Sequence, residues 1–203
     1  MKALQAHYLA HMRQSVPGRK AGLPSFQAGY TLVELLVVMA LGTILLSIAV
    51  PSMTAMLNTQ RANAAGSSFL ASLNLARAEA IKRNARVVVC KSTGGLSCML
   101  TGGWNQGRIT FHDANNNAAI DADEQLIERY GAMPDGLSLT GNTSVANYVS
   151  YSASGSAKLV TGAFQAGTFT LCLTPASSAE VQQIVLSSTG RARSRKGLAA
   201  DCQ

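Results

Sequence analysis

LLVVMALGTILLSIAVPSMTAML, residues 35–57, is the stretch that decides how this chain is organised. No charged residue occurs from Leu35 to Gln60, and nearly every position of the stretch is apolar or small. A helix of these 23 residues, rising about 1.5 Å per residue, is long enough to cross a hydrocarbon core of about 30 Å. The stretch therefore predicts a transmembrane helix near the N-terminus of a chain of 203 residues.

A secretory signal peptide and a buried core helix are the two alternatives to this membrane anchor. The apolar region of a signal peptide is shorter and ends at a small-x-small cleavage site. A buried core helix rarely continues this far without a polar stripe. Both alternatives fit the stretch less well than a helix that stays in the membrane.

The charges before the apolar stretch predict its orientation. Four basic residues and no acidic residue precede it, namely Lys2, Arg13, Arg19 and Lys20. The positive-inside bias then places the N-terminus in the cytoplasm and everything after about residue 58 outside. These four charges also make up more than half of the formal net charge of +7, so the rest of the chain is not strongly basic as a whole.

The pattern after the apolar stretch predicts a long helix followed by a β-rich region. Apolar residues recur at three- and four-residue steps from Arg61 to Arg86, which continues the helix beyond the membrane. Short β-prone runs separated by Gly, Asn and Ser follow. The expected strands are 87–90, 108–111, 125–130, 137–139, 148–151, 168–173 and 181–186. We expect an α+β fold, a long N-terminal helix packed on an antiparallel β-sheet.

Four cysteines lie on the outer side of the predicted membrane helix: Cys90, Cys98, Cys172 and Cys202. An oxidising compartment allows them to pair, and none has the C-x-x-C spacing of a metal or redox site. Four cysteines can pair in three ways, and spacing alone leaves all of them open. We favour Cys90 with Cys98, which closes a short Gly-containing loop, and Cys172 with Cys202, which pins the C-terminus.

The sequence AGYTLVELL, residues 28–36, resembles the processing site of type IV prepilins, with a small residue before the cut and an aromatic residue after it. The resemblance implies that a prepilin peptidase cuts after Gly29 and methylates the amine of Tyr30. Glu34 stands at the fifth mature position, where an acidic residue is costly inside a membrane helix. The resemblance implies that it meets the N-terminal amine of a neighbouring pilin or pseudopilin subunit. The leader is long for this class, and Met12 is an alternative start.

This resemblance divides the chain into four expected parts. Residues 1–29 form a cleaved leader, and residues 30–57 form the transmembrane part of the helix. Residues 58–86 form the periplasmic half of the same helix. Residues 87–203 form a β-rich periplasmic region, called the head from here on. The expected location is the bacterial inner membrane, crossed once, with assembly into a pilus or pseudopilus.

Two further stretches, LARAEAIKRN (75–84) with VVVC (87–90) and WNQGRITF (104–111), resemble the GspH/FimT family of type IV pilin-like proteins. The first has the family's transition from helix to first strand. The second supplies core side chains and leads into an Asn-rich loop. The family includes the minor pseudopilin of type II secretion systems and a minor pilin of type IV pili. The resemblance therefore implies a filament subunit without choosing between these two machines.

The segment GRARSRKG, residues 190–197, places four positive charges after the last predicted strand. We predict a basic loop here. In an extended conformation its three arginines would share one face at intervals of about 6.6 Å and could follow a phosphate backbone. The GRAR run at 190–193 resembles the Gly-Arg-x-Arg motif of DNA-binding FimT-type minor pilins, which implies binding of double-stranded DNA. The residues concerned are Arg191, Arg193, Arg195 and Lys196. The alternative is a solvated basic turn.

One loop has oxygen-bearing side chains at the spacing of a calcium site. They occupy positions 1, 3, 5, 9 and 12 of an EF-hand-like pattern and are Asp113, Asn115, Asn117, Asp121 and Glu124. Ala118 stands where the sharp turn of such a loop favours Gly, and a predicted strand precedes the loop where an EF-hand has a helix. We therefore expect a polar hairpin loop and no metal.

The sequence offers little to support an enzyme. His112 is the only histidine after the leader, and no G-x-S-x-G nucleophile motif accompanies it. No Gly-rich loop opens a helix where it could hold phosphates, so we expect no nucleotide and no cofactor. Two hypotheses remain. One is a minor pilin that binds DNA, and the other is a structural pseudopilin of a type II secretion system.

Overall fold

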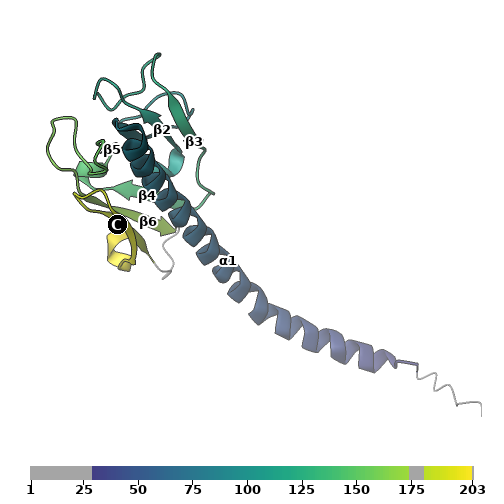
Figure 1. The fold of residues 1–203 in the computed structure, drawn as a ribbon. Coiled ribbons are helices and arrows are strands. Elements are labelled where there is room, and N and C mark those ends of the chain that lie inside the picture. The colour runs from purple at the N-terminus through teal and green to yellow at the C-terminus, as the bar shows by residue number, and fades with distance from the viewer. Residues whose placement is uncertain (1–28, 174–180, 203) are drawn as a thin grey trace, which may run out of the picture. The chain divides into compact units, whose positions relative to one another are not determined.

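The computed structural model describes residues 29–173 and 181–202 (Figure 1). The leader predicted for residues 1–29 lies outside the described residues except for Gly29. The described residues fall into two compact units, which divide between Leu46 and Ser47. The described chain contains one long helix, eight strands and three short 3₁₀ helices. The fold is α+β, as predicted.

The helix α1 (Leu32–Arg83) begins and ends with recognisable caps. At its start the Thr31 hydroxyl accepts a hydrogen bond from the backbone N–H of Glu34 at 3.2 Å. At its end Asn84 adopts a positive φ of 49°, and the N–H of Ala85 donates to the Ala80 carbonyl, as in a Schellman motif. Among the described residues α1 is the helix that is long and apolar enough to cross a membrane.

The head contains two four-stranded antiparallel sheets. Sheet A has the order β3-β2-β1-β5, and sheet B has the order β4-β6-β7-β8. The strands of sheet A are β1 (Val87–Lys91), β2 (Arg108–His112), β3 (Leu126–Tyr130) and β5 (Tyr148–Tyr151). The strands of sheet B are β4 (Leu137–Gly141), β6 (Gly167–Leu173), β7 (Gln182–Leu186) and β8 (Ala192–Lys196). The short helices are η1 (Trp104–Gln106), η2 (Thr143–Val145) and η3 (Ala199–Cys202).

The main core lies where the second half of α1 packs on both sheets (Figure 1). At its centre the rings of Phe69, Trp104 and Phe169 meet edge to face, with centroids 4.8 to 5.4 Å apart. The Trp104 indole N–H donates to the Val145 carbonyl at 3.0 Å. All three rings are fully buried. This cluster fixes α1 to the head because it joins side chains from the helix, from η1 and from β6.

A second, smaller core covers the other face of sheet A. Its centre consists of buried side chains from β1 and β2, namely Val88, Cys90, Ile109 and Phe111. Partly buried residues from two loops pack against it, among them Cys98 and Ile120. The loops 92–103 and 113–125 therefore cover the face of the sheet that α1 does not cover.

The seven predicted strands are all present, each within one residue of its expected ends except for β4, which continues to Gly141. One strand was not predicted. Residues 192–196, expected to be a loop, form β8 at the edge of sheet B. The prediction of a loop is therefore wrong for these residues, because pairing with β7 orders a segment that has no buried face of its own.

Candidate functional site

The basic segment extends along the free edge of sheet B. In the register of β7 with β8, Arg193 lies opposite Val185, and Arg195 lies opposite Gln183. Ile184, which alternates with these two partners, belongs to the main core. The side chains of Arg193 and Arg195 therefore project from the outer face of sheet B, away from α1.

Four side chains of this segment, defined here as the basic row, are exposed: Arg191, Arg193, Arg195 and Lys196. The Arg195 Nε donates to Oε1 of Gln183 at 2.8 Å. The guanidinium groups of Arg191 and Arg193 form no hydrogen bond or ion pair with another described residue. Lys196 borders a pocket of about 370 Å³ between α1 and the β7–β8 pair. The row thus presents cations at the edge of the sheet.

Gly190 explains how the chain turns into this row. It closes the β7–β8 hairpin with a positive φ of 80°, which favours glycine. A Cβ at this position would overlap the carbonyl oxygen of Gly155 in a neighbouring loop. The same oxygen accepts a hydrogen bond from Nε of Arg77, a residue of α1, at 2.9 Å. The hairpin is therefore packed backbone to backbone against a loop that α1 holds in place.

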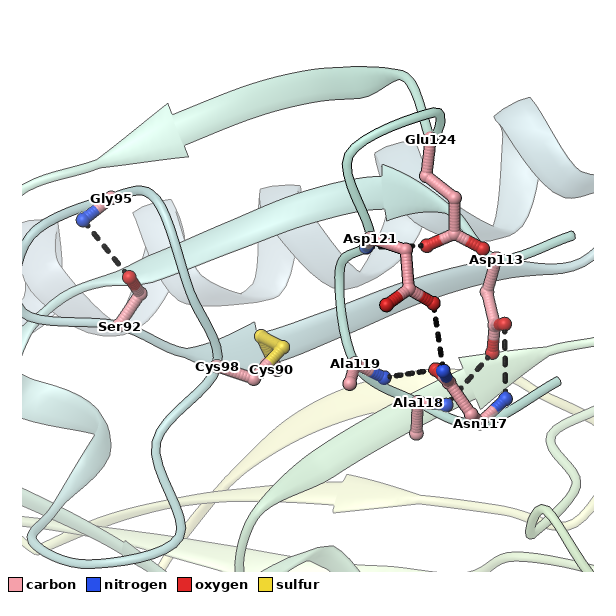
Figure 2. The surroundings of a disulfide bond; sticks show 10 residues. All are labelled: Cys90, Ser92, Gly95, Cys98, Asp113, Asn117, Ala118, Ala119, Asp121 and Glu124. Carbon is pink, nitrogen blue, oxygen red and sulfur yellow. Dashed lines mark hydrogen bonds between the residues drawn. A yellow bond between two sulfur atoms is a disulfide. The ribbon is translucent and has the colours of Figure 1, made fainter. Parts of the chain in front are cut away.

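Both disulfides favoured by the sequence analysis are present. Cys90 in β1 is bonded to Cys98, with the two Cα atoms 5.5 Å apart (Figure 2). Cys172 in β6 is bonded to Cys202 in η3, with the two Cα atoms 5.8 Å apart. The first ties a surface loop to sheet A. The second fastens the C-terminal segment to the outer face of sheet B, beside the basic row.

The acidic loop after β2 is closed by its own hydrogen bonds (Figure 2). The buried Asp113 carboxylate accepts from the N–H groups of Asn117 and Ala118. Glu124 accepts from the N–H of Asp121, and the Asn117 amide donates to an Asp121 oxygen at 2.8 Å. Ala118 adopts a positive φ of 57°. The sharp turn that we expected Ala118 to disfavour therefore forms, and these carboxylate oxygens have protein donors.

The predicted assembly residues lie at the start of α1. Gly29 and Tyr30 are exposed and precede the helix. Glu34 is three residues after the capping Thr31, in the position of a capping box. The structure therefore gives Glu34 a local place at the helix start. Its contact with a neighbouring subunit stays a prediction.

A buried arginine was not singled out by the sequence analysis. Arg108 in β2 is 2% exposed, and its Nε donates to the Ser72 hydroxyl of α1 at 2.7 Å. Its Nη2 donates to the carbonyl and hydroxyl of Ser68, and its guanidinium lies 3.9 Å from the ring centroid of Tyr130. Burial lowers the pKa of Arg108 to about 10, so it remains charged at neutral pH. This side chain binds α1 to sheet A through polar contacts.

Two sequence families match the chain. Residues 65–190 match the family described as type II transport protein GspH, and residues 24–50 match the prokaryotic N-terminal methylation motif. The first match covers more than half of the 203 residues. No curated protein matches the sequence significantly. The methylation motif implies processing by a prepilin peptidase and assembly with other pilin-like subunits.

One solved structure supports the fold at low sequence identity, and a second is reported beside it. The type IV minor pilin FimU of Pseudomonas aeruginosa is 16% identical, with a TM-score of 0.50, over 68% of this chain and 89% of FimU. The minor pseudopilin EpsH from the type 2 secretion system of Vibrio cholerae is 13% identical, with a TM-score of 0.46, over 67% of this chain and 97% of EpsH. The family match, the apolar helix and the two-sheet head lead to one conclusion: the chain belongs to the GspH family of minor pilins and pseudopilins.

Proposed function

We propose that this protein is a minor subunit of a type IV filament and binds double-stranded DNA through the basic row. The observation that carries the proposal is the exposure of the row on an ordered edge strand. Side chains two residues apart on a strand are separated by about 6.6 Å, so several arginines can contact one phosphate backbone together. Such contacts provide affinity without reading bases.

The second candidate function is that of a structural pseudopilin in a type II secretion system. It is favoured by the description of the matching family as a type II transport protein. In this case the charges of β8 protect a sheet edge and bind no ligand. The two functions differ in whether the head has affinity for a polyanion.

Replacing Arg191 and Arg193 together by Gln is expected to weaken DNA binding and its salt dependence. Each lost phosphate contact lowers the magnitude of the slope of log K against log salt by about 0.9. For the double variant the magnitude of this slope should therefore fall by up to about 1.8. Wild-type dissociation constants should be about 10⁻⁴ to 10⁻⁶ M at physiological salt, as for other non-specific contacts. The measurement is fluorescence anisotropy of a labelled duplex with the full mature chain in non-ionic detergent.

The matched control removes the same charge from elsewhere. Arg61 and Arg129 are both exposed and lie outside the basic row, on α1 and β3. Replacing both by Gln should change the slope of log K against log salt much less than replacing Arg191 and Arg193. Equal slopes for the two double variants would show that only net charge matters. Absence of binding by the wild type at low salt would remove the DNA function and favour the structural pseudopilin.

We further propose how the protein matures and assembles. A prepilin peptidase cuts between Gly29 and Tyr30 and methylates the new amine, which leaves 174 of the 203 residues. The single span keeps its N-terminus in the cytoplasm and its head in the periplasm, as the four basic leader residues indicate. In the filament the Glu34 carboxylate meets the N-terminal amine of a neighbouring subunit, which pairs its charge.

Replacing Glu34 by Ala is therefore expected to leave maturation intact and to lower filament incorporation. The intact mass should still correspond to 174 residues with one added methyl group, apart from the substitution itself. Protease added to spheroplasts should still remove the head. Recovery of the variant in sheared filaments should fall, because the partner of the neighbour's amine is lost. Normal recovery would contradict the assembly role of Glu34.

A further inference from the structure

The C-terminal segment, residues 197–202, reaches Arg195 of the basic row through Gln183, which contacts both Asp201 and Arg195. From this contact we infer that Gln183 and Asp201 are positioning residues that hold the Arg195 guanidinium on the outer face of sheet B. The Cys172–Cys202 disulfide fixes Asp201 in place for this role. The inference rests on the proposed DNA-binding function, because it concerns how that surface is organised.

Gln183 is the central member of this arrangement. It lies in β7 directly opposite Arg195, so both side chains project from the same face of the sheet. The Gln183 side chain is buried, with 7% of the residue exposed. Its Oε1 accepts from Nε of Arg195 at 2.8 Å, and its Nε2 donates to an Asp201 carboxylate oxygen at 2.9 Å. A single buried amide thus connects a cation and an anion.

The carboxylate of Asp201 determines which way the Gln183 amide points. A carboxylate only accepts hydrogen bonds, so the NH₂ end of the amide must face Asp201. The amide oxygen then faces Arg195, whose guanidinium only donates. The reverse orientation would set two donors against each other at Arg195 and two acceptors at Asp201. By accepting from the NH₂ end of the Gln183 amide, Asp201 therefore turns the amide oxygen toward Arg195.

Asp201 is itself held by local contacts and by the disulfide. Its carboxylate accepts from the N–H of Leu198 at 2.8 Å, and its own N–H donates to the Leu198 carbonyl at 2.9 Å. Gly197 closes the segment onto sheet B by donating its N–H to the Val181 carbonyl at 2.7 Å. The next residue after Asp201 is Cys202, which is bonded to β6. A covalent bond therefore anchors the turn that carries the carboxylate.

This arrangement makes Arg195 differ from the other arginines of the row. Its Nε is already engaged, so only its two Nη groups are available to a phosphate. Because Gln183 fixes the guanidinium before binding, less side-chain entropy is lost when a phosphate is bound. Arg193 lies on the same face of β8 and makes no such contact with a described residue. It is therefore the natural internal reference for Arg195.

The first test measures side-chain order without DNA. In the full mature chain in detergent micelles, hydrogen exchange of the Nε–H groups is followed by NMR for Arg195 and Arg193. The Arg195 proton should exchange at least several-fold more slowly than that of Arg193. Asp201→Ala should remove most of this difference, because the Gln183 amide then loses the acceptor that fixes it. Asp135→Ala, at an exposed turn residue, is the matched control and should change nothing.

The second test measures DNA affinity in a double-mutant cycle. The loss of affinity caused by Arg195→Gln should be about 2- to 10-fold larger in the wild type than in Asp201→Ala, which corresponds to the ordering of one side chain. A simple charge effect of Asp201 would instead leave this ratio near one. The double replacement of Cys172 and Cys202 by Ser should act in the same direction as Asp201→Ala. The latter variant keeps the disulfide and so remains informative if the Ser variant does not fold.

The two tests separate the inference from the proposed function. If Arg195 and Arg193 exchange equally fast in the wild type, the positioning role is overturned whatever the DNA result. If Arg195 is protected and Asp201→Ala abolishes this protection, the positioning role holds. Failure of the same protein to bind DNA then overturns the proposed function alone. A cycle ratio near one in a protein that binds DNA overturns the contribution of positioning to binding.

Discussion

Replacing Trp104 by Ala is expected to lower the free energy of unfolding by about 3–5 kcal/mol, the range for large aromatic side chains in cores. The indole is fully buried between the rings of Phe69 and Phe169, so the truncation leaves a cavity where α1 meets sheet B. Domains of this size have free energies of unfolding of about 5–15 kcal/mol, so the variant should lose a large part of its stability. The measurement is guanidinium unfolding of the full chain in detergent, followed by circular dichroism.

Two further variants divide this effect into its parts. Trp104→Phe keeps a ring in the core but leaves the Val145 carbonyl without its donor, which should cost about 1–3 kcal/mol for a buried acceptor. Phe164→Ala removes an aromatic ring that is 70% exposed and should cost less than about 1 kcal/mol. An equal loss for Trp104→Ala and Phe164→Ala would show that the ring cluster does not hold α1 to the head.

Replacing Gly190 by Ala should destabilise the head by about 2–5 kcal/mol. The positive φ of 80° is strained for alanine by about 1–2 kcal/mol. The overlap of the new Cβ with the Gly155 carbonyl oxygen forces one backbone segment to move, which adds about 1–3 kcal/mol. The same unfolding measurement applies, and the displaced hairpin should also weaken DNA binding by the basic row.

Gly162 provides a matched control for this prediction. Its φ of 87° is close to that of Gly190, but a Cβ there would meet no atom within 4 Å. Gly162→Ala should therefore show the conformational strain alone, about 1–2 kcal/mol. The difference between the two variants measures the overlap with Gly155. If both variants lose the same stability, the close approach of the two backbones contributes nothing.

The fold could be predicted from the sequence where buried residues recur at the regular spacing of a helix or a strand. The apolar residues of α1 recur at helical spacing, and the strands with a buried face carry apolar or β-branched residues that contrast with the turns around them. β8 has no such signal, because four of its five residues are exposed and it is ordered by hydrogen bonds to β7. Whether an edge segment pairs with a strand depends on residues outside the segment, so its own composition does not reveal it.

The candidate site was predicted as a set of charges but not as a geometry. The basic residues were evident in the segment GRARSRKG, and the disulfide pairing was favoured for the short loop it closes and the C-terminus it pins. The contact of Arg195 with Gln183 depends on the register of β7 with β8, which no local pattern specifies. The burial of Arg108 was missed because a charged residue at a strand end is usually solvated. The pair Ser68 and Ser72, one turn apart on the helix, could have indicated a polar contact on its packed side.

The position of β8 at the end of sheet B also bears on how heads behave when they are crowded. An edge strand offers unpaired backbone groups to any second strand, and two copies of β8 could in principle continue the sheet from one molecule into the next. Antiparallel pairing of two such strands would bring Arg193, Arg195 and Lys196 of one copy against those of the other. Like charges directly across a strand pair are destabilising. The charged side chains of β8 therefore disfavour edge-to-edge pairing of neighbouring heads and the aggregation that would follow from it.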